Sequence, residues 1–174
     1  SLGYGSKAFT LSMIENAVRV SGGRLSNEQL LKIIGLGKSL LNIPATPLPG
    51  VVKTLQNLRA RHCYSMVVFT KGDNLEQEGK LIRSGLSGFF KDVIVVSDKT
   101  KREYTHLCNM YDTDISHLCM VGNSFKSDIA PVLQLGGYAI YIPYKLVWKH
   151  EESDIYRHSH LREADHIEEI MNLL

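Results

Sequence analysis

Apolar residues recur at helical spacing over the first forty positions of the chain. The spacing predicts one helix over about residues 7–20, which Ser21-Gly22-Gly23 ends, and a second that begins at Ser26. Ser26 and Gln29 stand three apart before an apolar stripe, the pattern of a capping box in which each side chain satisfies a backbone amide of the other. Gly35 and Gly37 weaken this second helix and suggest that it packs closely against a neighbour.

The segment from Pro44 to Gly50 is the clearest boundary, because its prolines prevent a helix from continuing. Residues before it are helical, whereas the pattern after it alternates between strand and helix. We therefore predict a separate helical piece over residues 1–43 and an α/β core over residues 44–174.

Short apolar runs alternate with helical patterns throughout the predicted core. This order predicts right-handed crossovers and a parallel, three-layer Rossmann-like sheet with helices on both faces. From Tyr144 to Asp165 the chain is polar, without a further predicted strand, and a short helix over about 167–173 follows. The predicted helices cover about residues 51–61, 75–84, 102–111 and 127–135, and the predicted strands cover 64–70, 92–97, 118–122 and 138–143.

Composition narrows the class of protein. Of 174 residues, 44% are hydrophobic and 22% charged, so the chain can bury a core, and a net charge of +2 with scattered basic residues argues against a nucleic-acid or membrane surface. No apolar run approaches the length of a membrane span. The 3 cysteines form no C-x-x-C pair. We expect a soluble, cytoplasmic protein.

Two polar sites follow predicted strands. Thr70, with Lys71 and Gly72, offers a hydroxyl and backbone amides that can bind a phosphoryl oxygen; the alternative is a turn in which Thr70 caps the next helix. Lys99 comes just after the next strand and can neutralise a phosphate and a carboxylate, although a solvated surface lysine is the simpler interpretation of that residue alone.

A third polar site follows the apolar run that ends at Gly122. Asn123 stands at the predicted strand tip and Asp128 about one turn into the next helix, so oxygens of both can face a hard cation such as Mg²⁺. The alternative is that Asp128 interacts only with the helix dipole.

Taken together, Thr70, Lys99 and the segment from Asn123 to Asp128 resemble, in order and spacing, motifs II, III and IV of the haloacid dehalogenase-like (HAD) hydrolase superfamily. The resemblance covers about residues 48–143, and residues 1–43 look like part of its helical cap. It implies a phosphatase acting on a small phosphorylated metabolite through an aspartyl-phosphate intermediate. It further implies that Thr70 binds the phosphoryl group, Lys99 steadies nucleophile and phosphate, and Asn123 and Asp128 hold Mg²⁺, directly or through water.

The chain departs from that family pattern at two places. Asn123 stands where most members have Asp, which should weaken the binding of Mg²⁺. The first family motif, Asp-x-Asp-x-Thr on a central first strand, is absent: the first aspartate is Asp73. Asp112-Thr113-Asp114 matches Asp-x-Asp but is predicted to be a solvated turn. We expect a fragment that lacks the nucleophile and its strand, has no phosphatase activity, and self-associates or exchanges a strand to fill the open position.

Alternative functions remain open. A non-catalytic α/β binding or interaction module would explain the missing nucleophile. A 2-haloacid dehalogenase ranks lower, because that branch of the superfamily has Asn three positions before the aspartate, where this chain has Phe125. His158 and His160 could suggest a transition metal, but a solvated loop is favoured. Trp148 is expected to have a partly buried packing role.

Overall fold

The computed structural model describes residues 5–144, 151 and 153–174. These divide into two compact units, which are considered separately: one comprises residues up to Pro47 together with Val67–Val95, and the other Leu48–Met66 together with Val96–Leu174. The prediction made for Trp148 lies outside the described residues.

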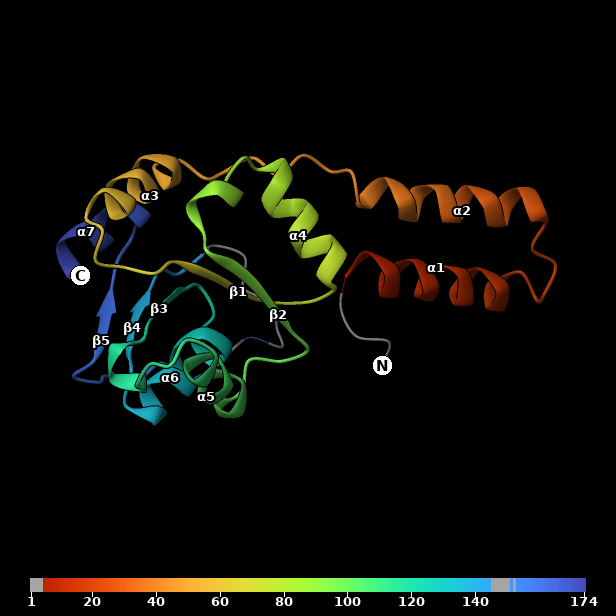
Figure 1. The fold of residues 1–174 in the computed structure, drawn as a ribbon. Helices are drawn as coiled ribbons and strands as arrows, with labels where there is room; N and C mark the ends of the chain where they lie inside the picture. The colour runs from red at the N-terminus through yellow and green to blue at the C-terminus, as the bar shows by residue number, and fades with distance from the viewer. Residues whose placement is uncertain (1–4, 145–150, 152) are drawn as a thin grey trace. The chain divides into compact units, whose positions relative to one another are not determined.

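The first unit contains a helical pair, α1 (Ser6–Val20) and α2 (Asn27–Leu40), which lie side by side (Figure 1). The predicted capping box is confirmed: the Ser26 amide donates to Gln29 Oε1 at 2.9 Å, and the Gln29 amide donates to Ser26 Oγ at 3.2 Å. Gly37 is buried, and a Cβ atom there would lie 2.1 Å from the Thr10 hydroxyl oxygen, so its lack of a side chain permits the close approach of the two helices.

The rest of the first unit joins two strands through a helix. Strands β1 (Val67–Lys71) and β2 (Asp92–Val96) form a two-stranded sheet, and α4 (Asn74–Arg83) lies between them in the sequence. The predicted strand over 64–70 thus begins three residues late, at Val67.

A charged contact ties the start of α1 to the start of α4. The Ser6 amide donates to Glu76 Oε2 at 3.0 Å, and Lys80 Nζ donates to Glu76 Oε1 at 2.8 Å. Lys7 pairs with Asp73 at 2.7 Å. Burial alone would raise the pKa of Glu76, but the hydrogen bonds from Lys80 and Ser6 outweigh it and leave that pKa below its usual value.

The second unit is built on a parallel three-stranded sheet in the order β3 (Cys119–Gly122), β4 (Tyr138–Tyr141) and β5 (Leu161–Glu163) (Figure 1). The absence of a strand between 144 and 165 was a wrong prediction. Strand β5 has only three residues, of which Leu161 alone is buried while Arg162 and Glu163 are exposed, so no run of apolar residues marks it in the sequence.

Helices cover both faces of this sheet, and the alternation along β4 shows why. Ala139 and Tyr141 pack with Phe125 and Ile129 on one face, whereas Ile140 packs with Leu58 and Ile170 on the other. The predicted α/β fold with parallel strands and helices on both sides is confirmed. The helices of this unit are α3 (Val51–Ala60), α5 (Lys101–Met110), α6 (Ala130–Leu135) and α7 (Ile170–Leu173). Among the described residues, none of the helices is long and apolar enough to cross a membrane.

Candidate functional site

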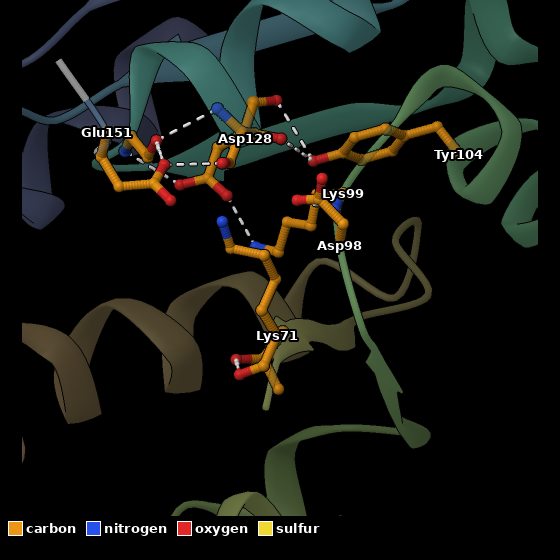
Figure 2. Close-up of polar contacts among 9 residues, drawn as sticks. Lys71, Asp98, Lys99, Tyr104, Asp128 and Glu151 are labelled. Carbon is orange, nitrogen blue, oxygen red and sulfur yellow. Dashed lines mark hydrogen bonds and ion pairs between the residues drawn. The ribbon is translucent and has the colours of Figure 1, made fainter. Parts of the chain in front are cut away.

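The second unit contains a buried ion pair. Lys99 follows β2 in the loop before α5, and its Nζ lies 2.6 Å from Asp128 Oδ1 (Figure 2). The side chains are only 9% and 7% exposed, respectively. Lys99 is therefore not a solvated surface residue, and Asp128 has a specific charged partner beyond any helix dipole.

The backbone at the end of β3 orients the Asp128 carboxylate. Its second oxygen, Oδ2, accepts a hydrogen bond from the Ser124 amide at 2.9 Å. The carboxylate also occupies the space next to Gly122, where a Cβ atom would lie 2.4 Å from Oδ2. Gly122 is thus required for the carboxylate to approach the strand end so closely.

Asp128 lies in a single π-helical turn, Phe125–Ile129, that precedes α6. This corrects the helix predicted to begin at residue 127. Ser124 caps the turn by accepting the Ser127 amide at 3.1 Å. Phe125 and Ile129 are 3% and 0% exposed and anchor the turn in the core. Such turns recur at functional sites because the extra residue redirects side chains.

Tyr104 of α5 lies beside the turn, with its hydroxyl directed toward the Asp128 segment (Figure 2). The hydroxyl of this fully buried residue lies 3.0 Å from the Ser127 carbonyl oxygen and 3.3 Å from that of Asp128, so the two carbonyls share its single proton. Burial, with a smaller contribution from Asp128, raises the pKa of Tyr104 well above its ordinary value, so the hydroxyl remains a donor.

Glu151 reaches the same turn from the segment after β4. Its Oε2 accepts hydrogen bonds from the hydroxyls of Ser124 and Ser127, the latter at 2.6 Å (Figure 2). Both serines are buried. Sequence reasoning missed Glu151, because it stands in a polar stretch with no spacing that links it to residues more than twenty positions away.

The structure brings two of the six sequence-predicted site residues into direct contact, Lys99 and Asp128. Asn123 directly precedes the capping Ser124, and it is exposed. The other three belong to the first unit: Thr70 and Lys71 end β1, and Gly72 follows with a φ of 137°.

Two alternative interpretations are also resolved. The helix cap proposed for Thr70 was wrong, because Asp73 caps α4 by accepting the Glu76 amide at 3.2 Å. The turn predicted at Asp112-Thr113-Asp114 is confirmed: Asp112 has a φ of 48°, and Asp114 caps the short helix that follows by accepting the Ser116 amide at 2.8 Å.

The described residues do not form a complete site for a divalent cation. Both carboxylate oxygens of Asp128 already accept hydrogen bonds, and within residues 5–144, 151 and 153–174 no cluster of three or more His, Cys, Asp or Glu side chains could hold a metal ion. Asn123 and Asp128 supply at most part of an oxygen ligand set.

The chemical capacity of the site follows from charge and burial. A buried lysine paired with a buried carboxylate is costly to desolvate, so the pair contributes little net stability to the fold. The Lys99 side chain can attract a further anionic group, while the contact with Asp128 holds it in place.

Comparisons with known proteins agree with this geometry. The family model for haloacid dehalogenase-like hydrolases matches residues 3–136. A haloacid dehalogenase-like family hydrolase from Xanthomonas campestris is 34% identical, with a TM-score of 0.83 over 97% of this chain and 71% of that one. No curated protein matches the chain.

More distant solved structures share the fold. A predicted phosphoglycolate phosphatase from Haemophilus somnus is 15% identical, with a TM-score of 0.67 over 99% of this chain and 78% of that one. The putative HAD-hydrolase YfnB from Bacillus subtilis, bound to magnesium, is 18% identical, with a TM-score of 0.63 over 99% and 84%. Dehalogenases also share this fold. The family model and the Xanthomonas campestris hydrolase establish that this chain belongs to the haloacid dehalogenase-like hydrolase family.

Proposed function

We propose that these residues form the lysine and metal-side part of a phosphatase that hydrolyses a small phosphorylated metabolite. The observation that carries the proposal is the buried pair of Lys99 and Asp128, 2.6 Å apart. Burial of an ion pair adds little to the stability of a fold, because desolvation of the two charges offsets their attraction. A site that must hold an anionic phosphoryl group, in contrast, benefits from a fixed, desolvated cation.

The family resemblance suggests a role for each residue. Lys99 holds the nucleophile and the phosphoryl group, and Thr70, with Lys71 and Gly72, binds phosphoryl oxygens. Mg²⁺ is the cofactor that we propose from the family and from the magnesium-bound Bacillus subtilis structure, and when bound it would supply charge neutralisation at the phosphoryl group. Asn123 and Asp128 are proposed as two of its ligands, directly or through water, with the remaining ligands supplied by other groups.

The nucleophile is the missing component. The 174 residues contain no aspartate before Asp73, so we propose that they do not turn over phosphate esters by themselves. We also propose that they self-associate, because an unpaired strand edge favours pairing with a second chain. Light scattering that gives only the monomer mass would contradict the second proposal.

The test compares the 174-residue chain with the complete product of the gene that encodes it. Both are assayed against a panel of phosphate esters and an aryl phosphate, with Mg²⁺ and with EDTA. We expect EDTA-sensitive hydrolysis by the complete product, abolished by Lys99→Met, and none by the 174 residues. An inactive complete product would contradict the enzyme hypothesis and favour a binding module.

The panel also includes a 2-haloacid, since dehalogenases share the fold. Phe125 stands three residues before Asp128, and its ring is 3% exposed and packs edge-on against Tyr141 at 5.6 Å. The side chain at this position therefore belongs to the core and offers no hydrogen bond to a halide or carboxylate. We expect no halide release.

A further inference from the structure

The contacts of Glu151 suggest a role that neither the family motifs nor the sequence assigns. One carboxylate oxygen, Oε2, accepts hydrogen bonds from two buried serine hydroxyls of the Asp128 turn. Glu151 is itself partly exposed, whereas both serines are buried. This makes Glu151 the acceptor on which both serine hydroxyls converge.

Ser124 connects Glu151 to Asp128 through two hydrogen bonds, one made by its hydroxyl and one by its backbone amide. A serine hydroxyl has one proton and two lone pairs. When the Ser124 hydroxyl donates its hydrogen bond to Glu151, a lone pair on Ser124 Oγ remains free to accept the Ser127 amide at 3.1 Å. The backbone amide of the same Ser124 donates to Asp128 Oδ2 at 2.9 Å, and the other oxygen of that carboxylate holds Lys99.

A capping role alone does not account for Glu151. Ser124 can cap the turn without it, since Ser124 Oγ itself accepts the Ser127 amide, and Oε2 of Glu151 accepts from the side-chain hydroxyls of Ser124 and Ser127. Its effect is to fix the direction of both hydroxyls, and through Ser124 the direction of the amide that orients Asp128.

We propose that Glu151 is a positioning residue: by accepting from Ser124 and Ser127 it holds the Asp128 carboxylate in the orientation that binds Lys99. An effect of Glu151 on kcat rests on the function proposed above, whereas its effect on the orientation of Asp128 does not. The two are therefore measured separately.

Two variants of Glu151 distinguish its role as a hydrogen-bond acceptor from the effect of its negative charge. Glu151→Gln keeps a carbonyl oxygen that can accept both hydroxyls but removes the charge, whereas Glu151→Leu removes the acceptor at similar size. Asp154→Asn removes a carboxylate from an exposed position three residues away and serves as the matched control.

The first measurement is amide hydrogen exchange by NMR in the 174-residue chain. We expect Glu151→Leu to speed exchange at Ser124 and Ser127 about tenfold, and Glu151→Gln and Asp154→Asn by less than about threefold. The amide of Ile140, a fully buried residue of β4, reports global opening and should stay unchanged. Unchanged exchange at Ser124, equal acceleration at Ile140, or a Gln variant that matches the Leu variant would each overturn the proposal.

The second measurement is the kinetics of the complete gene product. We expect Glu151→Leu to lower kcat about tenfold with KM within about twofold, and Glu151→Gln to restore most of kcat. An unchanged kcat would overturn the catalytic consequence. If the wild-type product has no activity, the proposed function fails while hydrogen exchange still decides the role of Glu151.

Discussion

Each of the two units contains a buried carboxylate that pairs with a lysine, and the two pairs differ in how they are built. Glu76 and Lys80 stand four residues apart on α4, 2.8 Å from each other, and the lysine side chain is 47% exposed. Asp128 and Lys99 are separated by 29 residues, lie 2.6 Å apart, and are both almost fully buried.

The difference indicates what each pair contributes. The pair on α4 needs only the helix to form, and its lysine remains hydrated, so it contributes a few tenths of a kcal/mol. The pair of the second unit has lost its water on both sides, and an apolar pair of similar volume would often stabilise a fold as well or better. Stability alone therefore does not account for the pair.

The largest expected effect comes from removing one member of the buried pair. Lys99→Met leaves the buried Asp128 carboxylate without its lysine partner, which should cost about 3–5 kcal/mol in free energy of unfolding, whereas Lys99→Met with Asp128→Leu should recover most of it. The matched control, Lys80→Met, should cost less than about 1 kcal/mol. Urea denaturation measures all three. A double variant as unstable as the single one would mean that the pair itself stabilises the fold.

A smaller loss is expected from Gly122→Ala, because the new methyl group would lie 2.4 Å from Asp128 Oδ2 and must displace that carboxylate. We expect about 1–3 kcal/mol of destabilisation and slower turnover by the complete product. The control is Gly35→Ala in α2, where the added methyl meets no atom within 4 Å and should stabilise the helix by about 0.5–1 kcal/mol. Equal behaviour of the two alanine variants would show that the approach of Asp128 to Gly122 is unimportant.

Tyr104→Phe removes the hydroxyl that donates to the Asp128 turn. We expect a cost of about 1–2 kcal/mol, since the carbonyl oxygens of Ser127 and Asp128 lose their shared donor in a buried place. Thermal unfolding gives the size of the effect. Exposed Tyr64→Phe provides the comparison and should change the free energy of unfolding by less than about 0.5 kcal/mol.

The smallest expected effect is the pH dependence of stability that Glu76 of the first unit contributes. Because the pKa of Glu76 is lower in the folded chain than its ordinary value of 4.5, its contribution to stability is complete above that value and is lost as pH falls through the folded pKa. Wild-type chain should therefore lose more stability than Glu76→Gln on acidification from about pH 6 to pH 3. Urea midpoints across this range measure the difference, and parallel pH profiles would contradict the assigned role of Glu76.

Much of the fold could be predicted from sequence because its signals are local. The capping box at Ser26 and the apolar run before Gly122 depend on neighbouring residues, and both are found as predicted. Strand β5 could not be predicted, because its place is set by pairing with β4 rather than by three residues of which two are polar.

The residues of the candidate site could likewise be predicted only where a local sequence signal marks them. Lys99 and Asp128 each follow a strand, which the sequence indicates, but their pairing is a tertiary contact. Glu151 gave no signal, since only the folded chain places it on the two serines. The π-helical turn was also missed, because one extra residue in a turn leaves no mark in a helical apolar pattern.

The 29-residue separation of Lys99 and Asp128 also has a kinetic consequence. Closing a loop of that length costs chain entropy before the contact contributes any stabilising free energy, whereas the pair on α4 forms together with its helix. The site should thus form after the transition state for folding has been crossed. Lys99→Met should accordingly accelerate unfolding while leaving the refolding rate nearly unchanged, a result that stopped-flow measurements can establish.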